Sequence, residues 1–307
     1  MRGEAGVNEL DELRALERGE SLPRPAFDPD RDTYFAGVSG VQVEAEAEML
    51  PGLTLRPAFA DLFAAPVIAF ASPPAPGAPH PSPWVAVEGG FSCKVRTELA
   101  MGAAVALEPL SRQEALWMCT AILRLYVPRP IKAVFVANKP IDELGQTWRT
   151  SVVRSFEAQQ SQIGAYRRDA VAALKPQDVL ALGQAVRACL QLWPEERFRT
   201  AFTLFDQVSW SVTPSAGTLL LWTAVGTLYA VPRGLNTGDR LADAVASHVT
   251  NTRPDRDRWY PRVRDAYRRR GAFVHAGKIN SQAEDFIEAV MIARTMLHRV
   301  IETGRLP

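Results

Sequence analysis

The sequence predicts an α+β protein in which a β-rich N-terminal domain is followed by an all-α helical bundle. From about Tyr34 to Asn138, short apolar and alternating segments are separated by proline and glycine, as in strands joined by turns. Beyond this region, apolar residues recur at the three- and four-residue spacing of amphipathic helices. We therefore divide the chain near residue 145, into a β-rich domain at 1–145 and a helical bundle at 146–307.

The β-rich domain is expected to contain several short strands and one helix, with a further amphipathic helix over Asn8–Arg18 ahead of them. Ser111 and Glu114 form a capping box at the start of the internal helix, whose apolar stripe runs to Tyr126. A proline-rich stretch over 72–81 predicts an exposed loop. The strand candidates are Val41–Glu46, Leu53–Leu55, Pro66–Ala71, Trp84–Val87, Phe91–Val95 and Ala133–Val136.

The bundle is expected to consist of helices almost throughout. Pro176 and Pro194 stand where first helical turns tolerate proline, and further prolines and glycines punctuate the rest. The expected helices are Gln146–Ser161, Pro176–Trp193, Glu195–Ser211, Ser215–Ala230, Thr237–Val249, Arg258–Arg270 and Ser281–Glu302.

Composition restricts the class of protein. With 47% hydrophobic and 22% charged residues, the 307-residue chain is an ordinary globular sequence. Its net charge of +1 excludes the strong basic field of a general nucleic-acid binder, although Arg253–Arg270 is locally basic. The N-terminus lacks a signal-peptide pattern and the longest apolar run, Leu219–Val231, is too short to cross a membrane. We therefore expect a cytoplasmic protein without membrane contact.

No cofactor or metal is expected. The three cysteines, Cys93, Cys119 and Cys189, form no paired motif, so neither a disulfide framework nor a zinc site is indicated.

The candidate site lies in Tyr267–Gly277, which reads YRRRGAFVHAG. Arginine offers a fixed fork of donors for phosphate oxygens, and histidine can move a proton near neutral pH, so the pair suits metal-free cleavage of a phosphodiester. Arg268, Arg269 and Arg270 all fit the spacing to His275. Residues five apart on a straight helix differ by roughly 140° in direction. A long arginine side chain, or a helix end near Gly271, would have to bring the two groups together.

This segment resembles the Tyr-x-x-Arg-Ser-x-x-Val-His-Gly signature of the HEPN superfamily, in its ApeA-like branch. The resemblance lies in Tyr267, Arg270, Val274, His275 and the small residues that follow. The resemblance extends upstream to two further segments. The apolar segment Leu219–Leu228 is similar to a family helix that usually reads Ala-Leu-Glu-Ala-Leu, and Asp239–Val245 is similar to the helix that follows it in the family. It covers about Glu195 to Glu302, a third of the chain.

The resemblance implies a helical bundle that forms a homodimer, with two copies of the Arg–His pair facing one cleft and cutting RNA without a metal. His275 would act as base toward a ribose 2′-hydroxyl or as acid toward the leaving oxygen, and Arg270 would hold the scissile phosphate. Such a ribonuclease would be a hydrolase of bacterial stress or phage defence. Its activity would need control by a trigger or inhibitor, and the N-terminal domain would sense that trigger or restrain the bundle.

Two departures from the family pattern favour a second hypothesis, a non-catalytic dimerisation or RNA-binding module. Gly271 replaces a small polar or amide residue, and Gly226 replaces the glutamate of the apolar helix. Asp206 or Asp239 could supply the missing carboxylate. A third hypothesis is a ligand sensor whose β-rich domain carries the function.

Further RNA contacts are expected along the basic segment. The candidate arginine is preceded directly by Tyr267, Arg268 and Arg269. Earlier in the segment an aromatic ring, Trp259, stands among arginines that include Arg262, as in RNA-binding grooves. A solvated start of a helix is the alternative interpretation of the Trp259 segment. Most other tryptophans, including Trp222, lie in apolar helical stripes and are assigned to the core.

Overall fold

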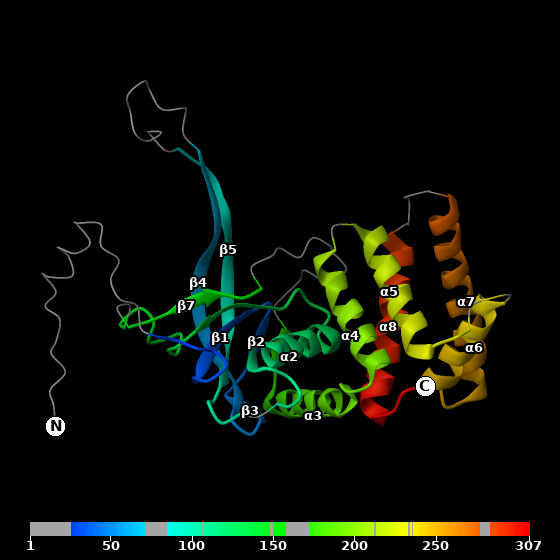
Figure 1. Ribbon diagram of the computed structural model, residues 1–307, viewed down its shortest axis with the longest axis horizontal. Coiled ribbons are helices and arrows are strands. Elements are labelled where there is room, and N and C mark those ends of the chain that lie inside the picture. Colours follow the sequence, from blue (N-terminus) through cyan, green and yellow to red (C-terminus); the bar gives the residue numbers. More distant parts are fainter. Residues whose placement is uncertain are drawn as a thin grey trace, which may run out of the picture.

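A computed structural model describes residues 26–70, 85–105, 107–147, 150–157, 172–211, 213–232, 234, 236–276 and 283–307. The helix expected over Asn8–Arg18 and the proline-rich loop at 72–81 lie outside the described residues. The described chain has an antiparallel sheet in its N-terminal region and helices in its C-terminal region (Figure 1). This arrangement confirms the α+β class.

The N-terminal region forms a six-stranded antiparallel sheet with strand order β3-β4-β5-β1-β6-β7. A separate parallel pair joins β2 to β8. The strands are β1 (Tyr34–Ser39), β2 (Val41–Val43), β3 (Ala47–Leu50), β4 (Leu53–Phe70), β5 (Val85–Met101), β6 (Lys132–Ala137), β7 (Val153–Ser155) and β8 (Ala172–Leu174).

Strands β4 and β5 form a long hairpin arm, where the sequence predicted separate short strands. Their pairing runs from Leu53 opposite Met101 to Phe70 opposite Val85, and the arm projects away from the sheet in Figure 1. Three register shifts interrupt it. Such shifts interrupt the regular pairing of two strands, and one continuous strand then looks like several short ones in the sequence.

The helices confirm most of the predicted elements. Their bounds are α2 (Arg112–Tyr126), α3 (Pro176–Leu192), α4 (Glu196–Gln207), the 3₁₀ turn η1 (Val208–Trp210), α5 (Pro214–Tyr229), α6 (Thr237–Val249), α7 (Arg253–Ala276) and α8 (Ala283–Thr303). The capping box expected at the start of α2 is present, because Ser111 accepts from the Glu114 amide and Glu114 accepts from the Ser111 amide.

The helix predicted over Gln146–Ser161 is wrong. Its described part contains β7, which pairs with β6 at the edge of the sheet. Thr150, Val152 and Val153 are β-branched and favour extended chain, and pairing with β6 selects that conformation over the weak helical pattern.

One hydrophobic core spans the sheet and the helices. Leu99 of β5, Leu116 of α2, Phe202 of α4 and Leu297 of α8 are fully or almost fully buried in the same cluster. Strands β7 and β8 both follow residue 145, yet they pair with β6 and β2. The sheet region therefore draws on chain from both sides of that position. No described helix has the length and apolar character needed to cross a membrane.

Candidate functional site

The basic segment forms helix α7, which continues from Arg253 through Gly271 to Ala276. The helix end considered near Gly271 is therefore not present. His275 lies on the last turn of α7, but its side chain is outside the described residues. His275 is five positions after Arg270 on this helix, which places the two backbone positions about 7.5 Å apart along the axis and about 140° apart around it.

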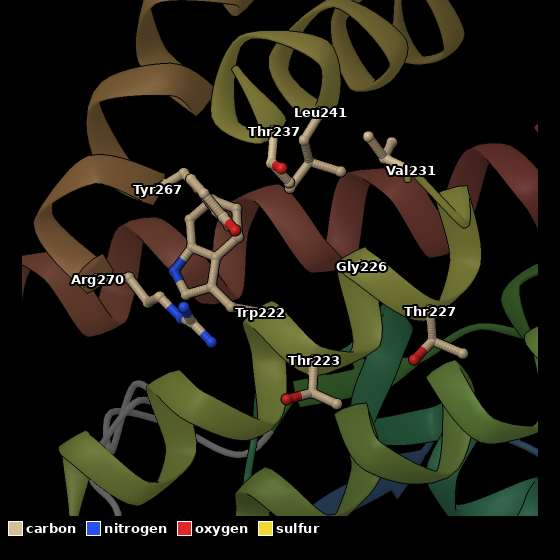
Figure 2. Close-up of a pocket in the computed structure, with 9 residues that line it drawn as sticks. All are labelled: Trp222, Thr223, Gly226, Thr227, Val231, Thr237, Leu241, Tyr267 and Arg270. Atoms are coloured by element: carbon tan, nitrogen blue, oxygen red, sulfur yellow. The ribbon is translucent and has the colours of Figure 1, made fainter. Parts of the chain in front are cut away.

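A pocket of about 310 Å³ lies between α5, α6 and α7 (Figure 2). It contains two of the residues that the sequence selected, Tyr267 and Arg270, and also Gly226, where the HEPN pattern has glutamate. The residues that line it are Trp222, Thr223, Gly226, Thr227, Val231, Thr237, Leu241, Tyr267 and Arg270.

Among the three candidate arginines, Arg270 is the one that faces this pocket. Its Nε is buried and has no hydrogen-bond partner among the described residues. Its guanidinium carbon lies 5.7 Å from the centre of the Tyr267 ring, and Tyr267 makes an edge contact of 5.4 Å with Trp222. The structure thus places a guanidinium with spare donor capacity beside two aromatic rings.

The neighbouring arginines are instead paired with carboxylates of flanking helices. Arg268 lies 3.7 Å from Asp239 of α6, and Arg269 lies 2.6 Å from Asp285 of α8. Both arginine side chains are about half exposed or more, so these ion pairs contribute little to stability. Neither Arg268 nor Arg269 lines the pocket, which distinguishes both of them from Arg270.

Trp259 and Arg262 come together at a different place on α7. The Arg262 guanidinium lies 4.7 Å over the Trp259 ring and forms an ion pair with Glu288 of α8. Hydrogen bonding to Glu288 raises the pKa of Arg262, against the lowering effect of burial. These two residues do not line the Arg270 pocket, so the structure divides the predicted RNA-binding residues between two locations.

Gly226 opens the pocket instead of supplying a carboxylate. A Cβ atom built at this position would meet nothing within 4 Å. None of the described lining residues is acidic. Asp239 bonds to Tyr260 and lies near Arg268, and Asp206 is buried elsewhere, so neither replaces the missing glutamate in the pocket.

Several residues that line the pocket were not predicted from the sequence as part of a site. Trp222 is in the core, as expected, with 4% of its surface exposed, but it also forms part of the pocket wall. Thr223 and Thr227 lie one turn apart on α5 beside Gly226. These small and polar residues share one face of an otherwise apolar helix, and that pattern in the sequence could have indicated a pocket at this position.

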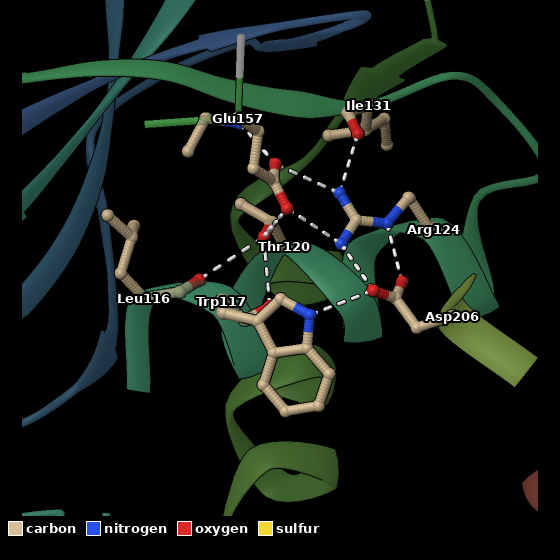
Figure 3. Close-up of polar contacts among 8 residues, drawn as sticks. Leu116, Trp117, Thr120, Arg124, Ile131, Glu157 and Asp206 are labelled. Carbon is tan, nitrogen blue, oxygen red and sulfur yellow. Dashed lines mark hydrogen bonds and ion pairs between the residues drawn. The ribbon is translucent and has the colours of Figure 1, made fainter. Parts of the chain in front are cut away.

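A second polar cluster is centred on Arg124 of α2 (Figure 3). Its five N–H groups donate to both oxygens of Asp206, to both oxygens of Glu157 and to the carbonyl of Ile131, at 2.7–3.1 Å. Trp117 adds a bond from Nε1 to Asp206 at 2.8 Å. Burial alone lowers the pKa of Arg124, but the two carboxylates raise it overall.

This cluster is a structural link and not a site. The Arg124 guanidinium has no donor left for a ligand, and only 2% of its side chain is exposed. Because Asp206 belongs to α4 and Arg124 to α2, the cluster ties the sheet region to the helical region.

Two buried cysteines and two half-buried histidines are engaged in packing. Burial raises the pKa of the Cys119 thiol to about 12 and also raises that of Cys189, so both are inert thiols at neutral pH. His248 bonds to the Tyr229 hydroxyl at 2.7 Å, and His298 stacks on Tyr126. Within the described parts of the chain, no group of three or more His, Cys, Asp or Glu side chains is arranged to hold a metal ion.

Comparisons with protein-family models, curated proteins and solved structures found no match to this chain. The HEPN assignment therefore rests on the motif residues and their spacing, and it remains a prediction.

Proposed function

We propose that the protein is a metal-independent endoribonuclease of the HEPN type, acting in bacterial stress or phage defence, with Arg270 and His275 as its site. The observation that carries the proposal is the Arg270 guanidinium, whose buried Nε lacks a partner among the described residues and which lines a pocket with two aromatic rings. A phosphate in the pocket would accept a charge-assisted hydrogen bond from the Arg270 Nε.

In this proposal Arg270 binds the scissile phosphate and offsets the charge that builds in the transition state. His275 takes the proton from a ribose 2′-hydroxyl or returns one to the leaving oxygen, and the need for that hydroxyl selects RNA over DNA. Because the two backbone positions lie about 140° apart on one helix, a homodimer is the arrangement that supports the chemistry best. One protomer would supply the arginine and its partner the histidine.

The second candidate is an RNA-binding or dimerisation module without catalysis. Two observations favour it: none of the described residues lining the pocket is acidic, and α7 continues unbroken past Gly271. In that case Arg270 would still bind phosphate, but no imidazole would approach it.

The test is incubation of the purified protein with total RNA in a chelator, comparing wild type with Arg270→Ala, His275→Ala and Arg268→Ala. The last variant removes the same charge from an exposed neighbour outside the pocket. Cleavage lost in the first two variants and retained in Arg268→Ala supports the enzyme. Absence of cleavage in every protein, with RNA binding lost only in Arg270→Ala, favours the module. Cleavage that survives Arg270→Ala contradicts the proposed site.

A further inference from the structure

We infer that the pocket beside Arg270 is a subsite for one nucleobase, so that the site takes a single nucleoside monophosphate unit with its phosphate at Arg270. This inference rests on the proposed function and adds a source of base preference to it. It follows from the size, the walls and the charge of the pocket and from the glycine that keeps it open.

The size of the pocket limits its occupant. Its volume of about 310 Å³ lies at the lower end of the range for small-molecule sites, roughly 300–1,000 Å³. One base with its sugar and phosphate suits such a space, whereas a stacked pair of bases requires more. The chain would therefore enter with a single nucleotide turned out of the strand.

The walls suit a planar, partly polar ring. Trp222 and Tyr267 form an aromatic wall, and Leu241 and Val231 add apolar surface (Figure 2). Stacking on aromatic rings is how single-stranded RNA bases are commonly bound. Three threonines, Thr223, Thr227 and Thr237, also line the pocket and add polar groups to these walls. The Thr223 hydroxyl already donates to the Leu219 carbonyl at 2.8 Å, so its oxygen is left as an acceptor for an N–H group on the base edge.

The charge around the pocket favours an anion. Arg270 is the one charged residue among the described lining residues, and its Nε lacks a protein acceptor there. Thr237, another lining residue, is the first residue of the 13-residue helix α6. The N-terminal end of a helix carries partial positive charge, which adds to that of the guanidinium. A nucleotide combines the ring and the anion that this lining recognises.

Gly226 determines whether the subsite is open. Since a Cβ atom there would have open space around it, an alanine fits without a clash, and a leucine would extend into the space that the base needs. Ala216 provides the matched control, because it lies exposed on the same helix and outside the pocket. Gly226→Ala serves as a control for folding at the position itself.

The experiment titrates the full-length protein with the four ribonucleoside 5′-monophosphates, with the uncharged nucleosides and with inorganic phosphate, using calorimetry. At least one mononucleotide should bind at least about tenfold more tightly than inorganic phosphate, the gain typical of one base–aromatic contact. It should also bind more tightly than its nucleoside, because the nucleoside lacks the phosphate that contacts Arg270. Gly226→Leu should lose the gain over phosphate, while Ala216→Leu keeps it, and neither variant should unfold at a temperature below that of the wild type. Equal binding of phosphate and mononucleotides, or unchanged binding in folded Gly226→Leu, overturns the subsite.

This readout is separate from cleavage. If the wild type cuts RNA but Gly226→Leu cuts it with the same base preference, the subsite is wrong and the nuclease proposal stands. If no RNA is cut but mononucleotides bind in a Gly226-dependent way, the nuclease proposal fails and the subsite stands.

Discussion

At the residue scale, two helix glycines show how packing determines the effect of one methyl group. A Cβ at Gly183 of α3 would lie 1.8 Å from the Met49 carbonyl oxygen, whereas one at Gly226 of α5 would meet nothing. We expect Gly226→Ala to raise the free energy of unfolding by about 0.5–1 kcal/mol, because alanine restricts the unfolded chain and favours helix. Gly183→Ala should lower it by about 1–3 kcal/mol, because β3 must shift. Urea denaturation measures both, and changes of the same sign at both positions would contradict this account.

Two half-buried histidines, His248 and His298, predict how stability depends on pH. Burial, followed by the nearby Arg299, lowers the pKa of His248; burial also lowers that of His298, although the Leu125 carbonyl opposes the effect. Between the lowered folded value and the unfolded value of about 6.5, the unfolded chain binds more protons. Stability conferred by these residues should therefore be complete above about pH 6.5 and be lost as the pH falls through the folded value.

The measurement compares urea midpoints at pH 7.5 and 5 for wild type and for a variant with both histidines replaced by asparagine. The urea midpoint of the variant should fall less than that of the wild type between pH 7.5 and pH 5. An equal loss in the two proteins would mean that other groups carry the pH dependence.

The candidate site could be predicted only in part from residue spacing. The spacing to His275 that the motif allows is met by all three arginines, Arg268, Arg269 and Arg270. Only the packing of α5 and α6 against α7 distinguishes Arg270 from the other two. Trp222 has the sequence context of a core residue and is buried, so nothing local indicates that one side of it borders a pocket.

At the scale of elements, local signals predicted the helices better than the strands. The capping box at Ser111, the proline at 176 and the apolar stripes are local features, and the structure contains the helices they indicate. The hairpin arm pairs residues 15 to 48 positions apart and contains register shifts, and β7 pairs with residues of β6 that lie 16 to 20 positions away. Local patterns do not encode such pairing.

The link between α2 and α4 gives a prediction for the Arg124 cluster. Arg124→Leu should lower the free energy of unfolding by about 3–5 kcal/mol, because Asp206 and Glu157 are left buried without their cation. Adding Asp206→Leu should recover part of that loss by removing one unpaired carboxylate. Arg256→Ala, which breaks an ion pair with Asp243 between half-exposed side chains, is the control and should change little. No recovery in the double variant would contradict the proposed charge balance.

At the scale of the whole molecule, the shared core and the Arg124 cluster join the sheet region to the helices. A signal received by the sheet region could therefore reach the bundle through α2 and α4. This connection is the route by which the sheet region would sense a trigger for the proposed nuclease or restrain it.

The proposed dimer predicts complementation between two inactive variants. If one protomer supplies Arg270 and its partner His275, mixing Arg270→Ala with His275→Ala allows heterodimers with one intact site. Random exchange of subunits should then restore about a quarter of wild-type RNA cleavage, since half the dimers are mixed and each has one of two sites intact. The control is each variant alone, incubated in the same way. Failure to restore cleavage, with subunit exchange shown by a tag, would place both residues of each site in one protomer.

The most direct test of the account measures RNA binding at Arg270. The affinity of a short single-stranded 2′-O-methyl RNA, which lacks the free hydroxyl needed for cleavage, is determined by fluorescence anisotropy in a chelator for wild type, Arg270→Ala and Arg268→Ala. We predict that Arg270→Ala weakens binding at least about tenfold, because a charge-assisted phosphate contact is lost, and that Arg268→Ala changes it by no more than about twofold. Equal affinities for the two variants would show that the pocket arginine has no special role and would contradict the proposed site.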